Sequence, residues 1–200
     1  MRTINSLEDL ERLYDAAVPT SLDKVASELS PLYRKWVEAS RFVVLSTVGP
    51  EGTDASPRGD DGSVAEVVDA GTLMIPDWRG NNRLDSLKNI VRDSRVSLMF
   101  MVPGSQNVVR VNGTAVLTDD PDVIARFDKK GLRPKTVIVV TVGETYFQCA
   151  KAILRSRLWS GEDESQGLPT AGEFIKQFKE DFAAREYDEN YPAYAKERMW

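Results

Sequence analysis

The sequence predicts an α+β protein, mainly β, in which antiparallel strands form a closed or half-closed barrel with helices at both ends. Between residues 41 and 147, short β-rich stretches alternate with turn signals, and only two helical patterns interrupt them. Closure into a barrel removes the exposed edges that such strands would otherwise leave. With 200 residues, 42% hydrophobic and 28% charged, the chain can bury one core, and we expect a single domain over residues 1–200.

Residues 1–40 are predicted to be a helical lead-in. Ser6 and Asp9 resemble a capping box, and apolar residues follow at helical spacing as far as Ala17, so that Pro19 ends this helix. A second helix is expected from Ser21. A serine followed by proline at 30–31 opens a third, "LYRKWVEAS".

Residues 41–160 are predicted to form the barrel core. The "GPEG" turn at 49–52 joins the first strand to a returning stretch, "TDASP". Two helices are expected within the core, at about 82–92 and 121–128. The remaining expected strands cover 41–48, 63–69, 71–76, 95–102, 107–118 and 135–147.

The chain beyond Phe147 is predicted to be helical again. "CAKAILRSRLW" is a basic, helix-like stretch, and 161–172 is a polar linker within the final 161–200 segment. An amphipathic helix, "EFIKQFKEDFAARE", then repeats phenylalanines at helical spacing. The last residues, "YDENYPAYAKERMW", put four aromatics on a polar tail, which either frays in solvent or packs on another surface such as a second subunit.

The composition excludes several classes of function. The chain has no histidine and a single cysteine, Cys149, which excludes His-based nucleophilic catalysis, an internal disulfide, Cys-cluster metal sites and His-ligated zinc or haem. Residues 160–200 hold ten acids against five bases and carry the whole net charge of −5, so there is no basic field for nucleic acid. No apolar run would span a membrane, and the N-terminus lacks the apolar region of a signal peptide, so we expect a cytoplasmic protein.

The segment "DWRGNNR" at 77–83 is the strongest candidate for a ligand site. A helix that begins near Asn82 directs unpaired N–H groups and a positive dipole end at this turn, with Asn81 or Asn82 as its cap. Arg83 adds a planar guanidinium group, which can form two hydrogen bonds to a phosphate, and Trp78 adds an apolar surface. These residue types suit a phosphorylated aromatic such as a nucleotide or flavin, although a capped surface loop has the same composition.

Two other stretches support the ligand interpretation. Arg58 and Gly59 follow a predicted strand within "SPRGDDG", where a ligand could lie against exposed backbone. Lys151 and Arg155 share one helical face at i, i+4, where like charges repel unless an anion lies between them. The alternative for this pair is two solvated cations on a surface helix.

The order of these motifs resembles the pyridoxamine 5′-phosphate oxidase-like FMN-binding split-barrel family. The matching stretches cover about residues 30 to 160 and include "RFVVLSTVGPEGTDASPRGD", "GNNRLDSL", "RVNG" and "CAKAILRSRLW". Within the family they look like a bacterial branch that carries the Gly-Asn-Asn-Arg turn. The combination is specific, whereas each motif alone is weak.

The resemblance implies a six-stranded antiparallel split barrel and a homodimer with two shared FMN sites at the subunit interface. It also implies a set of cofactor-binding residues in three groups. The phosphate group would be held by Asn81, Asn82, Arg83 and Ser86, the ring edge by Arg58, Gly59 and Asp60, and further contacts near the interface would come from Arg110, Lys151 and Arg155.

Two departures from the family pattern affect the function. At its phosphate-binding turn the oxidase has a Ser-Arg-Lys run, where this chain reads Leu84-Asp85-Ser86. We therefore assign the role of the basic phosphate-binding residue to Arg83. The oxidase also uses a histidine near its C-terminus to hold its vitamin substrate, and this chain has none. We therefore expect an FMN-dependent oxidoreductase acting on a small molecule other than the vitamin. The alternatives are a non-catalytic flavin carrier or redox sensor and an F420-dependent reductase.

Overall fold

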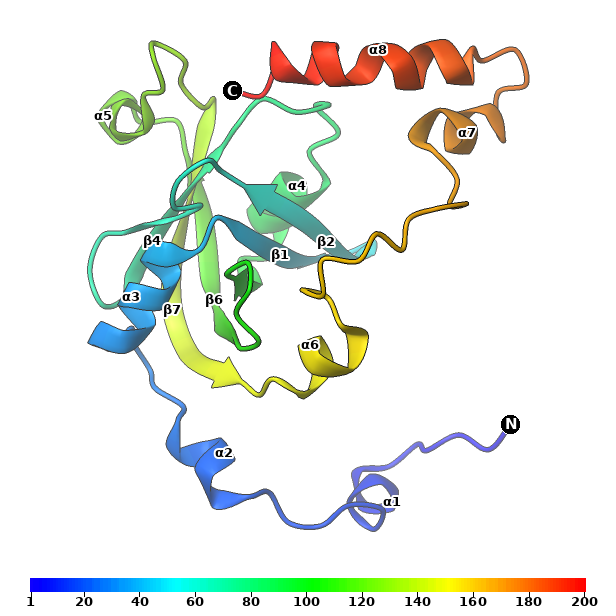
Figure 1. The fold of residues 1–200 in the computed structure, drawn as a ribbon. Helices are drawn as coiled ribbons and strands as arrows, with labels where there is room; N and C mark the ends of the chain where they lie inside the picture. The colour runs from blue at the N-terminus through cyan, green and yellow to red at the C-terminus, as the bar shows by residue number, and fades with distance from the viewer.

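One antiparallel sheet curls around a single core in the computed structural model, which describes residues 1–200 (Figure 1). The strands are β1 (Phe42–Gly49), β2 (Gly52–Gly59), β3 (Glu66–Val67), β4 (Thr72–Asp77), β5 (Arg95–Met101), β6 (Val108–Thr118) and β7 (Thr136–Gln148). Their order in the sheet is β2-β1-β5-β6-β7-β4-β3, and every neighbouring pair is antiparallel. The predicted antiparallel α+β architecture is confirmed, with six longer strands and the two-residue β3.

Alternation along the strands determines which face is buried. In β1, Val43 and Leu45 are fully buried, and their partners Phe100 and Leu98 in β5 are fully buried too. Residues directly opposite each other in an antiparallel pair lie on the same face, so the two strands bury one continuous apolar surface. β6 and β7 extend this surface, and the helix after β4 covers it with Ile90.

The longest strand pair, β6 and β7, contains a bulge between Asn112 and Gly113. A Cβ atom on Gly113 would lie only 2.0 Å from the backbone oxygen of Thr141. Glycine is therefore required here by a close backbone approach, which accounts for the last residue of the "RVNG" motif.

Most helices lie before β1 or after β7, while α4, α5 and η1 lie between strands, and none is long and apolar enough to cross a membrane. They are α1 (Leu7–Glu11), α2 (Pro19–Asp23), α3 (Pro31–Ala39), α4 (Asp85–Arg92), α5 (Pro121–Ile124) with the 3-10 helix η1 (Ala125–Phe127), α6 (Lys151–Ser156), α7 (Ala171–Lys176) and α8 (Ala184–Lys196). α3 begins as predicted, with the Ser30 hydroxyl accepting from the Tyr33 N–H at 3.3 Å.

The N-terminal lead-in is less helical than predicted. The first helix ends at Glu11 instead of continuing to Ala17, and Pro19 is the first residue of α2 rather than a stop before it. Neither helix buries a residue. Short helices are only marginally stable unless they pack against other elements. The helical spacing of apolar residues therefore does not make these helices longer.

The strand predicted at 63–69 is wrong over most of its length, because only Glu66 and Val67 pair in the sheet. The chain before them bonds to the end of α3 instead, with the Val64 N–H donating to the Ser40 carbonyl at 2.8 Å. Val64 is buried all the same. An apolar side chain can thus enter the core from a loop, which a strand pattern does not distinguish.

The single amphipathic helix predicted from residue 173 is also wrong. The chain forms a helical hairpin of α7 and α8, in which the Asp188 carboxylate accepts from the Gly172 N–H at 2.8 Å and from the Thr170 hydroxyl. The expected aromatic tail is mostly helical, although it contains Pro192. Figure 1 shows α8 extending from the barrel, with its C-terminal end nearest to the strands.

Candidate functional site

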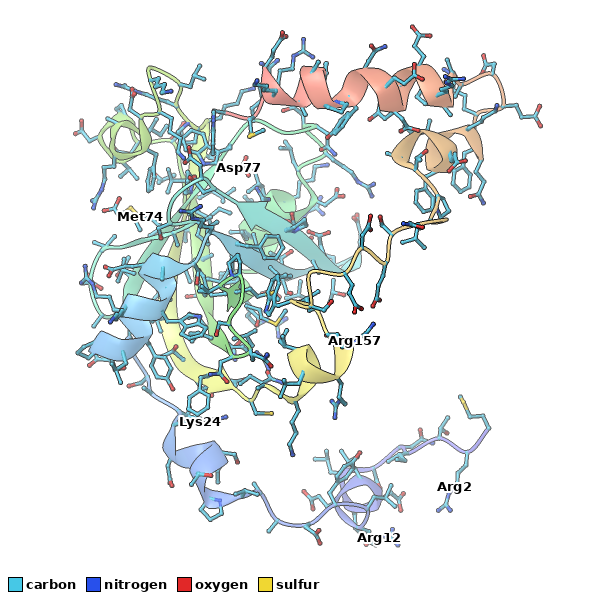
Figure 2. The ribbon with its side chains drawn as sticks, viewed as in Figure 1. Arg2, Arg12, Lys24, Met74, Asp77 and Arg157 are labelled. Atoms are coloured by element: carbon cyan, nitrogen blue, oxygen red, sulfur yellow. The ribbon has the colours of Figure 1, made fainter.

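A cavity of about 1150 Å³ opens at one end of the barrel. Its walls come from β2, the end of β4, the turn that follows β4, the start of α4, the connection from α5 to β7 and the two C-terminal residues. Asp77 marks this end of the barrel in Figure 2, whereas Lys24 and Arg157 lie at the opposite end. Ligand sites in proteins commonly have volumes of about 300 to 1000 Å³, so the cavity can hold a cofactor-sized molecule.

The turn between β4 and α4 has an unusual backbone. Asn82 and Leu84 both adopt left-handed conformations, with φ of 61° and 64°. Asparagine tolerates this region, but leucine does so at a cost of about 1 kcal/mol or more. The Asn81 side chain accepts from the Arg83 N–H at 3.0 Å and thereby fixes the turn. Strain of this kind concentrates at functional sites.

The expected asparagine cap of the following helix is wrong. α4 begins at Asp85, its capping position is occupied by Leu84, and no side chain bonds to the N–H groups of its first turn. Asp85, Ser86 and Leu87 all line the cavity. An uncapped helix start at a cavity wall presents open N–H donors and a positive dipole end to a ligand.

Two arginines of the site are paired with carboxylates. Arg58 forms an ion pair with Asp77, which also lines the cavity, and only 20% and 15% of their side chains are exposed. Arg83 pairs with Asp85 at 2.5 Å, but its side chain is 80% exposed. Arg58 is therefore a fixed part of the site, whereas Arg83 is a solvated group that can turn toward a ligand.

Unpaired donors lie among the cavity residues. The Arg58 Nε and the Thr136 hydroxyl are both buried and have no hydrogen-bond partner, and both residues line the cavity. Buried polar atoms without partners are rare, because each costs about 1 to 3 kcal/mol.

The cavity is positively charged in an acidic protein. Its five basic residues are Arg58, Arg79, Arg83, Arg133 and Lys135, and its three acidic residues are Asp54, Asp77 and Asp85. The Ser86 hydroxyl donates to one of these acids, Asp54, at 2.5 Å. The excess of bases favours an anionic ligand.

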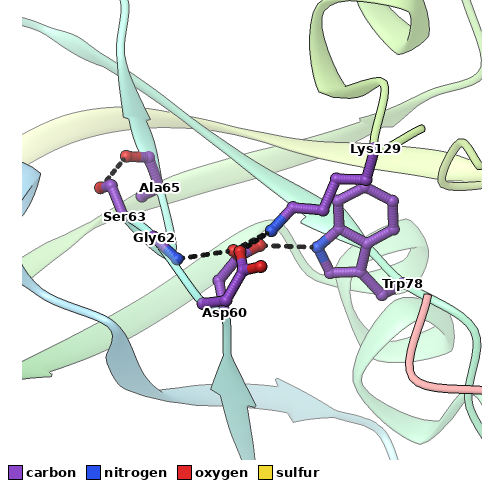
Figure 3. Close-up of polar contacts among 7 residues, drawn as sticks. Asp60, Gly62, Ser63, Ala65, Trp78 and Lys129 are labelled. Atoms are coloured by element: carbon purple, nitrogen blue, oxygen red, sulfur yellow. Dashed lines mark hydrogen bonds and ion pairs between the residues drawn. The ribbon is translucent and has the colours of Figure 1, made fainter. Parts of the chain in front are cut away.

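Asp60 anchors a second cluster beside the cavity (Figure 3). Its side chain is only 4% exposed and accepts from the Trp78 indole at 3.0 Å, from the Gly62 N–H at 3.0 Å and from Lys129. Burial lowers the pKa of Lys129, but its hydrogen bonds to Asp60 and Asp61 outweigh this effect, and the pKa lies above its ordinary value. Lys129 is therefore charged, and Trp78 is held in one orientation.

The structure gathers most of the sequence-predicted site residues around the cavity. Those that line it are Arg58, Gly59, Trp78, Asn81, Asn82, Arg83 and Ser86. Asp60 lies behind Trp78 rather than in the wall.

Three predicted site residues lie elsewhere in the chain. The guanidinium of Arg110 lies 5.3 Å from the ring centre of Tyr146 on the outer face of the sheet. Lys151 and Arg155 are exposed on α6, at the end of the barrel opposite Asp77 (Figures 1 and 2). One chain does not bring these three to the cavity, so their assignment to the site requires a second subunit.

Sequence reasoning missed two parts of the wall. One is the connection before β7, which supplies Leu132, Arg133 and Lys135, together with Thr136 at the start of β7. The other is the C-terminal pair Met199 and Trp200. The run "KKGLRPKT" offered a signal, since it places four bases around a glycine turn. No group of three His, Cys, Asp or Glu side chains that could hold a metal ion occurs in the chain.

The family model for pyridoxamine 5′-phosphate oxidase matches residues 29–149, which is more than half of the chain. The barrel and its cavity therefore define a protein of the split-barrel class. The chain belongs to the pyridoxamine 5′-phosphate oxidase family. No curated protein sequence matches it.

Several solved structures are similar to the chain at low identity. A putative pyridoxamine 5′-phosphate oxidase from Lactobacillus delbrueckii is 24% identical, with a TM-score of 0.49 and coverage of 60% of this chain and 95% of that one. An FMN-binding protein from Syntrophomonas wolfei is 14% identical, with a TM-score of 0.43 and coverage of 57% and 86%. The protein HupZ from Group A Streptococcus is 15% identical, with a TM-score of 0.46 and coverage of 57% and 89%.

Proposed function

We propose that this protein binds FMN in the cavity and uses it as an oxidoreductase on a small molecule. The observation that carries the proposal is a cavity with an excess of basic residues, whose wall includes an uncapped helix start. Membership in the pyridoxamine 5′-phosphate oxidase family supports the same cofactor. A bound flavin would supply the redox chemistry, which this chain, with no histidine, has few groups to supply itself.

Each part of the cavity suits one part of FMN. The phosphate group fits the start of α4, where the open N–H groups and Arg83 provide donors, and Ser86 can redirect its hydroxyl from Asp54. The ring fits the side where Trp78 lies, with Arg58 as a donor toward its polar edge. A cationic donor at this edge would stabilise the negative charge of the reduced ring, which favours redox chemistry over simple storage.

The first test of this proposal is the cofactor itself. The purified protein should be yellow or take up FMN, with flavin absorption bands and with FMN identified by mass in the released material. A colourless protein that binds no FMN at micromolar concentration would contradict the proposal. A protein with a bound flavin but no redox turnover with any electron donor would instead be a carrier or sensor.

The second test concerns Arg83. A hydrogen bond to a charged group contributes about 1.5 to 3 kcal/mol. At about 1.4 kcal/mol per tenfold, Arg83→Ala should weaken FMN binding by about 10- to 150-fold. Exposure and competition from Asp85 favour the lower part of this range.

Arg79→Ala is the matched control, since Arg79 is exposed on the same turn and has no ion pair. We expect a loss of less than tenfold for it. Riboflavin, which lacks the phosphate, should not distinguish Arg83→Ala from the wild type. If only Arg79→Ala weakens FMN binding, Arg79 rather than Arg83 binds the phosphate. If neither variant weakens it, the turn is a surface loop that binds no ligand.

A deazaflavin cofactor, F420, is the second candidate. The observation in its favour is the additional basic wall of Arg133 and Lys135, which could accept a longer acidic tail. Retention of F420 but not FMN in parallel titrations would decide for it. Arg133→Ala combined with Lys135→Ala should weaken F420 strongly and FMN little.

We also propose a homodimer with shared sites. Arg110, Lys151 and Arg155 lie outside the cavity of their own chain, and the N-terminal segment exposes Leu7, Leu13 and Leu22. A two-fold interface would cover such surfaces and bring residues of a second chain to the cavity. Light scattering at micromolar concentration should give the mass of a dimer. A monomer with FMN bound would contradict this arrangement.

A further inference from the structure

The C-terminal helix α8 is joined to the barrel only through its end. Every hydrogen bond and ion pair of residues 184–200 stays within the hairpin of α7 and α8, as in the pair of Arg185 with Glu189. Met199 and Trp200, by contrast, lie in the cavity wall. In Figure 1 the arm of α7 and α8 extends from the barrel and returns to it at the C-terminus.

The contact at this end is a defined aromatic and cationic cluster. The Trp200 ring meets Trp78 edge to face, with 5.2 Å between ring centres and 78° between planes. The Lys129 ammonium lies 3.8 Å from the centre of the Trp200 ring and 5.6 Å from that of Trp78. Asp60 bonds to both Lys129 and Trp78, so it fixes the two groups that Trp200 contacts.

Trp78 and Trp200 form an aromatic corner in the cavity wall. The two indole rings stand nearly at right angles to each other. A flat aromatic ligand can stack on the face of one ring while the edge of the other covers its side. The corner adjoins the basic turn that carries Arg79 and Arg83. A ligand with a planar ring and an anionic tail fits both features together.

We propose that Trp200 is a latch that closes the cavity over a planar ring and retains it. This inference rests on the proposed function, because FMN supplies such a ring. Trp200 acts on the ligand as a wall, while Lys129 and Asp60 are positioning residues that hold the wall in place. Since the arm meets the barrel only at Met199 and Trp200, it opens when Trp200 leaves Lys129 and closes when it returns.

The latch can be tested without ligand. Hydrogen exchange of residues 184–200 should be faster in Trp200→Ala and in Lys129→Met than in the wild type, because the arm loses its attachment. Trp200→Phe keeps a ring over Lys129 and should restore most of the protection. Tyr194→Ala is the control, since this exposed tyrosine of α8 contacts Arg198 and Tyr191 rather than the cavity.

The second measurement is FMN release from the full-length protein. The aromatic and cation–π contacts together predict a dissociation rate increased about tenfold in Trp200→Ala, which corresponds to about 1.4 kcal/mol. Trp200→Ala should also change the absorption spectrum of bound FMN, because an indole next to the ring is lost. Tyr194→Ala should leave both unchanged.

The outcomes separate the latch from the proposed function. If the wild type binds FMN and Trp200→Ala releases it at the wild-type rate, the latch is refuted while the cofactor stands. If hydrogen exchange in 184–200 is the same in the wild type and in Trp200→Ala, the latch is also refuted. If no FMN binds but exchange increases in Trp200→Ala and Lys129→Met, the latch stands and the cofactor assignment fails.

Discussion

Removing the guanidinium of Arg58 should destabilise the protein, because it leaves the Asp77 carboxylate without a partner in the cavity wall. Breaking a fully buried ion pair costs about 3 to 5 kcal/mol. Here 20% and 15% of the two side chains remain exposed, so water reduces the cost of Arg58→Met to about 2 to 3 kcal/mol. At about 2 to 4 °C per kcal/mol for a chain of this size, Tm should fall by about 4 to 12 °C.

The assay is a double-mutant cycle in the absence of FMN. Arg58→Met, Asp77→Asn and the double variant are compared by thermal and urea unfolding, and the double variant should recover most of the lost stability because no unpaired charge remains. The exposed pair Arg34 and Glu38 is the control, since both side chains are nearly half exposed and their coupling should be below about 0.5 kcal/mol.

The same variants separate stability from binding. The double variant should regain stability but not affinity for FMN, because it still lacks the guanidinium of Arg58 in the cavity wall. A single variant that loses less than about 1 kcal/mol, or a coupling no larger than in the control pair, would refute the view that this ion pair is shielded from water.

Two further predictions concern the packing of the sheet and the pH dependence of stability. Gly113→Ala should destabilise the protein by about 1 to 3 kcal/mol in urea unfolding, because its Cβ would meet the Thr141 oxygen at 2.0 Å, whereas Gly143→Ala, with its nearest atom at 3.5 Å, should cost much less. Hydrogen bonds from Arg95 lower the pKa of Asp93 from 3.8 to about 2. Asp93 therefore stabilises the fold fully above about pH 4, and this contribution is lost as the pH falls toward 2. Carboxyl NMR shifts should titrate near 2 in the wild type and at a higher pH in Arg95→Gln, although still below the ordinary value, because the backbone N–H of residue 95 continues to donate to Asp93. An unchanged midpoint would show that the Arg95 side chain is not the cause.

Local patterns in the sequence predicted most of the barrel. Alternation of apolar and polar residues identified β1 and β5, because a strand with one buried face must repeat every two residues. The serine and proline at 30–31 located the start of α3, since capping depends on adjacent residues only. Glycine and asparagine likewise predicted a turn at Trp78 to Arg83, and this turn lines the cavity.

Errors occurred where a contact distant in sequence decided the local structure. Residues 63–65 had a strand pattern, but Val64 bonds to Ser40 of the α3 end instead of a neighbouring strand. The break between α7 and α8 depends on Asp188, which bonds back to Gly172 and draws the second helix against the first. Neither partner can be recognised from the residues that surround each segment.

The sequence by itself determined the antiparallel barrel, the absence of histidine chemistry and the polar turn that suits an anionic ligand. Only the tertiary structure decided that Arg58 is paired with Asp77, that the connection before β7 completes the cavity, and that Trp200 rests on Trp78 and Lys129. Turns, caps and alternation follow from interactions between neighbouring residues, which leave a periodic signal in the sequence. Contacts between distant segments leave no such signal, because they form only after the sheet has curled and brought its ends together.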